Sequence, residues 1–196
     1  MLVLGLDIAT SSGVCLMDTA QPPHEWRCFA IEAEGHNAEE KAGDLAMALN
    51  LQLAKHCPAF AAIEMPQRSV QRFRKKGADI AGEKDELTIN PAALQLSAMA
   101  GAAVAVLDLA GVAWGLIHPV TWRKAYFGSG YKPRVGWKDS AMEFAKMQKI
   151  VLPPTVRAAR DAAEAIGIAR AWQKCSFVPD RHQQTFINLR TGREAA

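Results

Sequence analysis

The sequence predicts an α/β domain with a mixed sheet of five strands, three antiparallel strands first and two parallel strands after them, flanked by helices. The first observation behind this prediction is an opening series of three strand-like segments separated by turn residues, which is typical of an antiparallel meander. The second is the alternation that follows, in which helical periodicity leads into short apolar runs at residues 59–65 and 112–117. A strand that returns after a helical crossover normally runs parallel to an earlier strand.

The opening segment, residues 2–14, is apolar except for Asp7 and a small polar turn that we expect to end at Gly13. An unpaired carboxylate in a core is costly, so an acid in such a strand is solvated at the strand end, paired with a base or bound to a metal. A simple cap or edge residue is the alternative. The meander continues with a return strand over residues 14–18 and a third strand through Trp26, Phe29 and Ile31.

The pattern becomes helical at Asn37 and stops at Cys57-Pro58. A buried strand over residues 59–65 then carries Glu64. If the crossover follows the commonest arrangement, this strand lies beside the first one, and Asp7 and Glu64 lie side by side.

Residues 67–89 have a different character, and we expect a long, mobile, charged excursion without regular structure. A basic run with one aromatic suits phosphates and an unstacked base, whereas a solvated charged loop is the plain alternative. The residues concerned are Arg68, Arg72, Phe73, Arg74, Lys75 and Lys76.

Asn90-Pro91 is a good helix start, an N-cap followed by proline. The segment Leu96–Ile117 is long enough to span a bilayer, but Asp108 at its centre would cost roughly 2.5 to 3.5 kcal/mol, and Gly111 offers a break. We therefore expect a buried helix followed by a strand, with no membrane association. Gly101 would let this Ala-rich helix pack closely on the sheet or on a second copy of the chain, and the sequence leaves both open.

The strand over residues 112–117 ends at His118, which we expect to be a hydrogen-bonded structural residue. Thr121 is expected to cap a short helix, and Lys138 to open the next one, where a cation opposes the helix dipole and favours a phosphate partner. The bases that we expect to contact nucleic acid in this region are Arg123, Lys124, Lys132, Arg134 and Lys138.

The last predicted helix runs from about residue 157 to 173 and carries Asp161 and Glu164 on one face. Small apolar residues surround these acids, which predicts that this face of the helix packs inward. Acids on an inward-packing face need a cation to neutralise their charge. Residues 1–175 are expected to form one domain, and residues 176–196 a polar, basic tail.

Four acids thus come from two strands and one helix: Asp7, Glu64, Asp161 and Glu164. Carboxylate oxygens suit Mg²⁺ or Mn²⁺. Two such ions, roughly 3.5 to 4 Å apart, support in-line cleavage of a phosphodiester.

Three motifs carry a resemblance to a known family: Gly-Leu-Asp-Ile-Ala-Thr-Ser-Ser-Gly, then Ala-Ile-Glu, then Arg-Asp-Ala-Ala-Glu-Ala-Ile-Gly-Ile-Ala. Together they resemble the RuvC family of Holliday-junction resolvases, which have an RNase H-like fold. The resemblance runs from Leu2 to about Trp172 and implies metal binding by the four acids, DNA contact by Lys138 and a wedging role for Phe73. It also implies branched DNA as substrate and a homodimer.

Two positions depart from the family pattern. Glu164 stands where the family usually has Asp, which lengthens that arm by one methylene, and the loop after Glu64 is longer and more charged. A branched-DNA nuclease of broader range, of the type that some phages encode, is equally compatible.

Composition fits a protein of the reducing cytosol. The net charge is only +3, so a nucleic-acid surface must come from the placement of bases. The four cysteines have no metal spacing, which predicts free thiols, and the first residues do not resemble a signal peptide. Two rival functions remain: a non-catalytic RNase H-like nucleic-acid-binding module, and an actin-like sugar kinase, whose phosphate turn has glycine where this chain has Ala9 and whose fold needs two such domains.

Overall fold

The structure is a computed structural model, and it describes residues 1–66, 72–75, 86–89 and 91–192. A sheet with the strand order β3-β2-β1-β4-β7 forms its centre. Strand β1 pairs antiparallel with β2 and parallel with β4, and β4 pairs parallel with β7. The predicted mixed sheet is thereby confirmed. The strands are β1 (Leu2–Asp7), β2 (Ser11–Asp18), β3 (Arg27–Glu32), β4 (Phe60–Glu64) and β7 (Ala113–Ile117).

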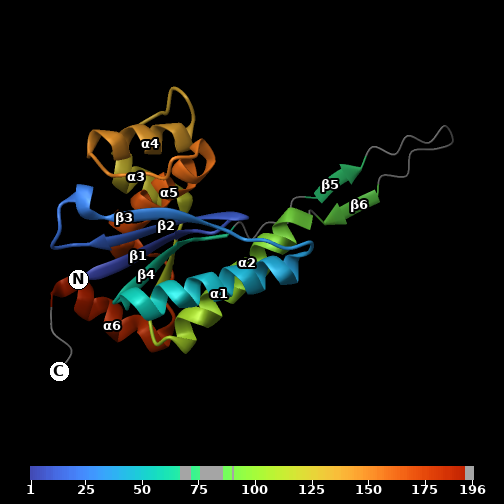
Figure 1. Cartoon of the computed structure of the whole chain (residues 1–196), viewed down its shortest axis with the longest axis horizontal. Helices are drawn as coiled ribbons and strands as arrows, with labels where there is room; N and C mark the ends of the chain where they lie inside the picture. The colour runs from blue at the N-terminus through green and yellow to red at the C-terminus, as the bar shows by residue number, and fades with distance from the viewer. Residues whose placement is uncertain (67–71, 76–85, 90, 193–196) are drawn as a thin grey trace.

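Helices cover both faces of this sheet (Figure 1). One face packs on α1 (Ala38–His56) and α2 (Pro91–Leu109), which bury Leu4 and Leu6 of β1. On the other face α5 (Val156–Arg170) packs directly on the strands, and α3 (Pro119–Phe127) and α4 (Trp137–Met147) pack on α5. Short 3₁₀ turns occur at Pro23–Glu25 and Trp172–Lys174.

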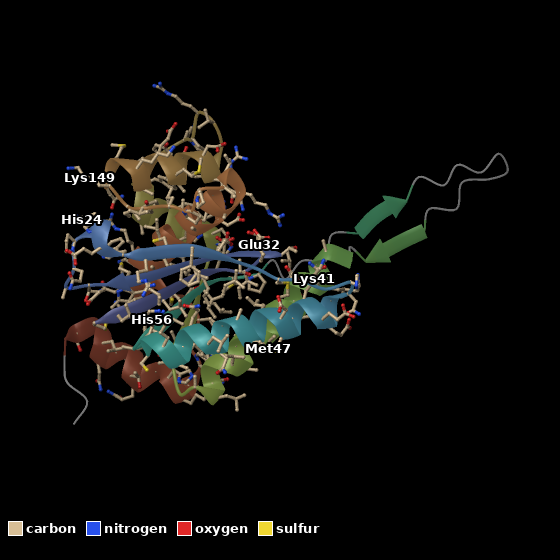
Figure 2. The ribbon with its side chains drawn as sticks, viewed as in Figure 1. His24, Glu32, Lys41, Met47, His56 and Lys149 are labelled. Atoms are coloured by element: carbon tan, nitrogen blue, oxygen red, sulfur yellow. The ribbon has the colours of Figure 1, made fainter. Side chains whose placement is uncertain are left out.

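Helix α1 begins and ends where the sequence predicts. The side chain of Asn37 accepts a hydrogen bond from Glu40 N at 2.8 Å, and Cys57 closes the helix in the left-handed conformation at φ 46°. Leu45, Leu49 and Leu53 recur on one face and are buried against the sheet. Met47 points outward from the opposite side of the helix (Figure 2).

Part of the expected charged excursion is a hairpin. Strand β5 (Arg72–Lys75) pairs antiparallel with β6 (Glu86–Ile89), so the expectation of a segment without regular structure is wrong there. The hairpin extends away from the sheet and its helices (Figure 1). Residues 67–71 and 76–85, with Arg68 and Lys76, lie outside the described residues, as does the predicted cap Asn90.

Helix α2 and β7 are separate elements, so Leu96–Ile117 is not one continuous helix. Among the described residues, one helical segment, Ala92–Leu109, is long and apolar enough to cross a membrane. Its mean hydropathy is 1.7. Such a single helix is weak evidence of a span. Only 17% of this window is buried, because Met99, Ala103 and Leu107 face inward while the outer side is exposed. The expected buried helix is therefore buried on one side only.

The expected C-terminal tail is wrong for residues 180–191. They form α6 (Asp180–Thr191), which packs beside β7 and buries Phe186. The Phe186 ring lies 5.1 Å from the ring of Phe60, centroid to centroid. Arg181 and His182 hydrogen-bond the carboxylate of Asp108 at the end of α2. A single buried aromatic and a set of polar contacts thus fix this helix, and α5 is not the last helix of the chain.

Candidate metal and nucleic-acid site

Asp7 and Glu64 end two neighbouring parallel strands. Strands β1 and β4 pair up to Leu6 and Ile63, and the two acids follow as the next residues. This confirms that the crossover through α1 sets the two acids side by side. Both strands have buried residues on both faces. The two acids lie at the strand ends, where the buried core of the sheet ends and the pocket begins.

Helix α5 crosses the sheet at very short range because two glycines lie beneath it. A Cβ added at Gly5 would lie 2.3 Å from the carbonyl oxygen of Ala165, and one added at Gly13 would lie 2.0 Å from that of Asp161. Gly13 is part of β2 and pairs directly with Asp7, so it does not end the turn as expected. The close packing brings the acids of α5 next to those of the sheet.

Asp161 and Glu164 are buried on the inward face of α5. Their exposed fractions are 5% and 4%, and Asp7 on β1 is 9% exposed. Spacing by three residues keeps the two helical acids on the same face. The predicted inward-facing pair is therefore confirmed, on a helix that Thr155 caps at its start.

Two of the carboxylates, Asp7 and Glu64, have a raised pKa. Burial raises the pKa of Asp7 well above its ordinary value, and the charges of Glu164, Glu64 and Asp161 raise it further. Burial also raises the pKa of Glu64, against a lowering by the indole N–H of Trp122. The site thus carries more negative charge than the protein's own cations neutralise.

Two cations reach into the cluster. Lys138 Nζ lies 2.5 Å from Asp161 Oδ1 and 3.3 Å from Glu164 Oε2, and Arg123 Nη2 lies 3.6 Å from Glu164 Oε1. Burial lowers the pKa of Lys138, but the hydrogen bond to Asp161 and the charges of the acids more than offset this and raise it. Arg160 Nε hydrogen-bonds Asp139 at 2.7 Å and borders the same pocket.

Asp7, Glu64 and Glu164 line an open pocket of about 510 Å³. Asp161 lines an adjoining hollow together with Lys138. Hard oxygen donors with a surplus of negative charge fit a divalent ion such as Mg²⁺ or Mn²⁺. Within the described part of the chain, no three His, Cys, Asp or Glu side chains form a ready-made metal site. Lys138 instead bridges Asp161 and Glu164 and places a positive charge beside them.

The predicted DNA-contacting residues fall into three groups. Arg123 and Lys138 lie at the acid pocket. Lys124, Lys132 and Arg134 are exposed on and after α3. The segment Arg72–Lys75, with Arg72, Phe73, Arg74 and Lys75, forms β5, whose side chains the structure does not describe, so their roles stay predictions.

The sequence reasoning assigned no role at the site to Trp122 or Trp137. The indole N–H of Trp122 donates a hydrogen bond to Glu64 Oε2. The Arg123 guanidinium lies between the rings of Trp122 and Trp137, 5.2 and 5.1 Å from their centroids. His118, expected to be structural, caps α3 by accepting a hydrogen bond from Val120 N, so Thr121 is not the cap. The sequence held one signal of these contacts: a tryptophan directly precedes a basic residue twice, in Trp122-Arg123 and in Trp137-Lys138.

Solved structures resemble this chain over nearly its full length. The structure of Thermus thermophilus RuvC has a TM-score of 0.56 and 16% identity, covering 98% of this chain and 97% of that one. T. thermophilus RuvC in complex with Holliday junction substrate has a TM-score of 0.55 and 16% identity, covering 87% and 91%. The yeast mitochondrial Holliday junction resolvase Ydc2 has a TM-score of 0.48 and 13% identity, covering 97% and 83%.

No family model matches the sequence, and no curated protein matches it either. At such low identity the similarity to T. thermophilus RuvC shows the fold. The chain has the RuvC type of RNase H-like fold, with three antiparallel strands followed by two parallel ones.

Proposed function

We propose, from a fold shared with RuvC and from the buried acids at the end of its sheet, that this chain is a metal-dependent endonuclease that cuts phosphodiester bonds in branched DNA such as Holliday junctions. The observation that carries the proposal is the convergence of Asp7, Glu64, Asp161 and Glu164 from three elements at two adjoining hollows. A purely structural role does not account for four carboxylates gathered together, three of them buried and Glu64 half-buried, where burial and the neighbouring charges raise the pKa of Asp7.

The four acids would hold one or two Mg²⁺ or Mn²⁺ ions. Such ions supply a water of lowered pKa and neutralise the charge that develops on the leaving oxygen of the phosphodiester. The acids themselves would act as ligands, so they would neither donate nor accept the proton of the attacking water. Glu164, one methylene longer than aspartate, reaches Lys138 from the same helix face as Asp161.

Cationic side chains would bind the DNA phosphates around the pocket. Arg123 offers a planar guanidinium held between two indole rings, which limits its freedom before substrate arrives. Lys138 is 45% exposed and can turn from Asp161 to a phosphate oxygen. A phosphate that takes Lys138 away from the acids would thereby leave both carboxylates free for a metal.

A homodimer is part of the proposal. The outer side of α2 is apolar and exposed, with Leu94 55% and Leu109 88% accessible. Two active sites are required to nick two strands of a four-way junction, and a second copy of the chain supplies the second site. Exposed apolar helix surface of this kind is more typical of an interface than of a free surface.

The direct test is incubation of the protein with a labelled four-way junction and with plain duplex DNA, with and without Mg²⁺. We expect cutting of the junction that depends on the ion. Shifting of the junction without cutting would instead favour the non-catalytic binding module, and consumption of ATP in the presence of sugars would favour the kinase.

The ligand role predicts which variants lose activity. Asp7→Asn and Glu64→Gln should abolish cutting and leave junction binding largely intact, because each removes one negative oxygen but no DNA contact. Glu143→Gln on α4, an exposed acid, is the matched control and should cut at the wild-type rate. Normal cutting by either of the first two variants would remove that acid from the site.

A further inference from the structure

We propose that Trp122 is a positioning residue that fixes the carboxylate of Glu64 and the guanidinium of Arg123 at the acid pocket. This inference rests on the proposed function, because it assigns a role toward the ion and the phosphate that the pocket would hold. Trp122 touches neither of them and acts through its two neighbours.

The indole of Trp122 is well suited to hold Glu64. The side chain is fully buried, at 0% exposure, and its N–H donates to Glu64 Oε2. An indole has one donor in a fixed direction, so the hydrogen bond selects one orientation of the carboxylate. Glu64 would otherwise be free to rotate about its side-chain bonds, since it ends β4 at the edge of an open pocket.

A notch in α5 fixes the ring itself. A Cβ added at Gly167 would lie 2.7 Å from both Cε3 and Cζ3 of Trp122, closer than side-chain atoms can approach. Gly167 follows Glu164 by three residues on the same helix face. The helix that carries two of the acids therefore also provides the space in which the ring sits.

The face of the same ring supports Arg123. The guanidinium lies 5.2 Å from the Trp122 centroid, with Trp137 5.1 Å away on another side. Among the described atoms, the buried Nε of Arg123 has no hydrogen-bond partner, so the two ring contacts and the ion pair with Glu164 orient the group. One residue thus contacts both an acid and a base that line the pocket.

Loss of the N–H should weaken ion binding. Removal of an outer hydrogen-bond partner of a metal ligand typically lowers metal affinity or activity by about 10- to 100-fold. Trp122→Phe keeps an aromatic ring in the cavity and removes only the donor. We therefore expect a Mn²⁺ affinity about 10- to 100-fold below wild type, together with a higher Mg²⁺ concentration for half-maximal cutting and a smaller change in maximal rate.

Trp114→Phe is a matched control. Trp114 is also buried, at 6% exposure, and its N–H also donates to a carboxylate, Asp108 Oδ1 at 2.9 Å, but that carboxylate belongs to the contact between α2 and α6. Both variants lose a buried indole N–H that donates to a carboxylate. Only Trp122→Phe should change Mn²⁺ affinity, measured by calorimetry on the metal-free full chain.

A second measurement uses the wild-type protein and so does not depend on the folding of a variant. The chain has five tryptophans, and each indole N–H gives one NMR signal. Addition of Mg²⁺ should shift the Trp122 signal and leave the Trp114 signal in place. An unmoved Trp122 signal at saturating Mg²⁺, or a Trp122→Phe variant that binds Mn²⁺ as tightly as Trp114→Phe, would overturn the positioning role alone. A wild-type protein that binds no divalent ion would overturn the proposed function and this inference with it.

Discussion

Asp7 shows at the scale of one residue how a functional site opposes stability. The sequence predicts a functional role for this acid because it interrupts an apolar strand. In the structure Asp7 is 9% exposed and lies beside three other acids. Its pKa is raised first by burial and then by those neighbours. An acid whose folded-state pKa lies above its unfolded-state value binds its proton more tightly when folded. Its destabilising contribution is absent below the unfolded-state pKa, grows as the pH rises between the two values and is complete above the folded-state pKa.

Asp7→Asn should therefore make the metal-free protein more stable at neutral pH, since asparagine has no charge to bury. The gain in the free energy of unfolding should shrink as the pH falls toward about 4, where the unfolded acid also becomes protonated. Urea denaturation at a series of pH values in a chelator measures this difference. Mg²⁺ should stabilise the wild type more than the variant. A variant that is no more stable than wild type at neutral pH would contradict the repulsion argued for the site.

Gly13 exemplifies what the sequence alone did not reveal at this scale. Its small size suggested a turn, but its role depends on α5, which is nearly 150 residues away in the chain. Periodicity reports which face of an element is apolar, and it does not report how closely another backbone approaches. For the same reason the sequence did not predict that the Trp122 ring packs against Gly167.

Gly13→Ala should cost about 1 to 3 kcal/mol of stability, because the added Cβ meets the backbone of Asp161 and α5 must move. Cutting should fall as well, since Asp161 moves with its helix. Gly43→Ala in α1 is the control: a Cβ there meets nothing within 4 Å, and alanine should stabilise the helix by about 0.5 to 1 kcal/mol. Chemical denaturation of both variants tests the contrast, and equal stabilities would argue against the close packing of α5.

Elements with a strong pattern were predicted well. Helix α1 has a cap, a regular apolar face and a stop, and the sequence located all three. The five strands of the main sheet are short apolar runs bounded by turn residues, so they too were found. Helix α6 was missed because most of its residues are polar and Phe186 is its single buried residue. The hairpin β5-β6 was missed because charged residues, which are uncommon in strands, make up much of it.

Phe186→Ala should detach α6 and cost about 3 to 5 kcal/mol, the usual range for a buried phenylalanine. The ring packs on Phe60 and Trp172, and the loss would leave a cavity between the helix and the sheet. Ile187→Ala, at a 47% exposed neighbour, should change stability by less than about 0.5 kcal/mol. Thermal unfolding of the two variants and hydrogen exchange of residues 180–191 measure the effect. Similar values for both would mean that the polar contacts with Asp108 hold α6 without the ring.

At the scale of the whole molecule, the sheet separates two surfaces. Helices α3 and α4 lie on one side, and α1 and α2 cover the other (Figure 1). The acid pocket is lined by residues of α3, α4 and α5 together with Asp7 and Glu64. A contact between two copies through α2 would leave both pockets uncovered for DNA. The sequence left open whether α2 packs on the sheet or on a second copy. In the structure it packs on α1 and buries Met99, Ala103 and Leu107, so its outer side is available.

The outer side of α2 predicts the oligomeric state. Leu94, Gly101, Ala105 and Leu109 recur along one exposed stripe, and the small residues at its centre allow a second helix to approach closely. Light scattering after size exclusion should give the wild type twice the mass of one chain. The double variant Leu94→Glu with Ala105→Glu should run as a monomer, since burying two carboxylates at the interface is costly. Met147→Glu on α4, a 77% exposed position on the other side of the sheet, should remain a dimer. A monomeric wild type would contradict the homodimer, and a double variant that stays dimeric would locate the interface away from α2.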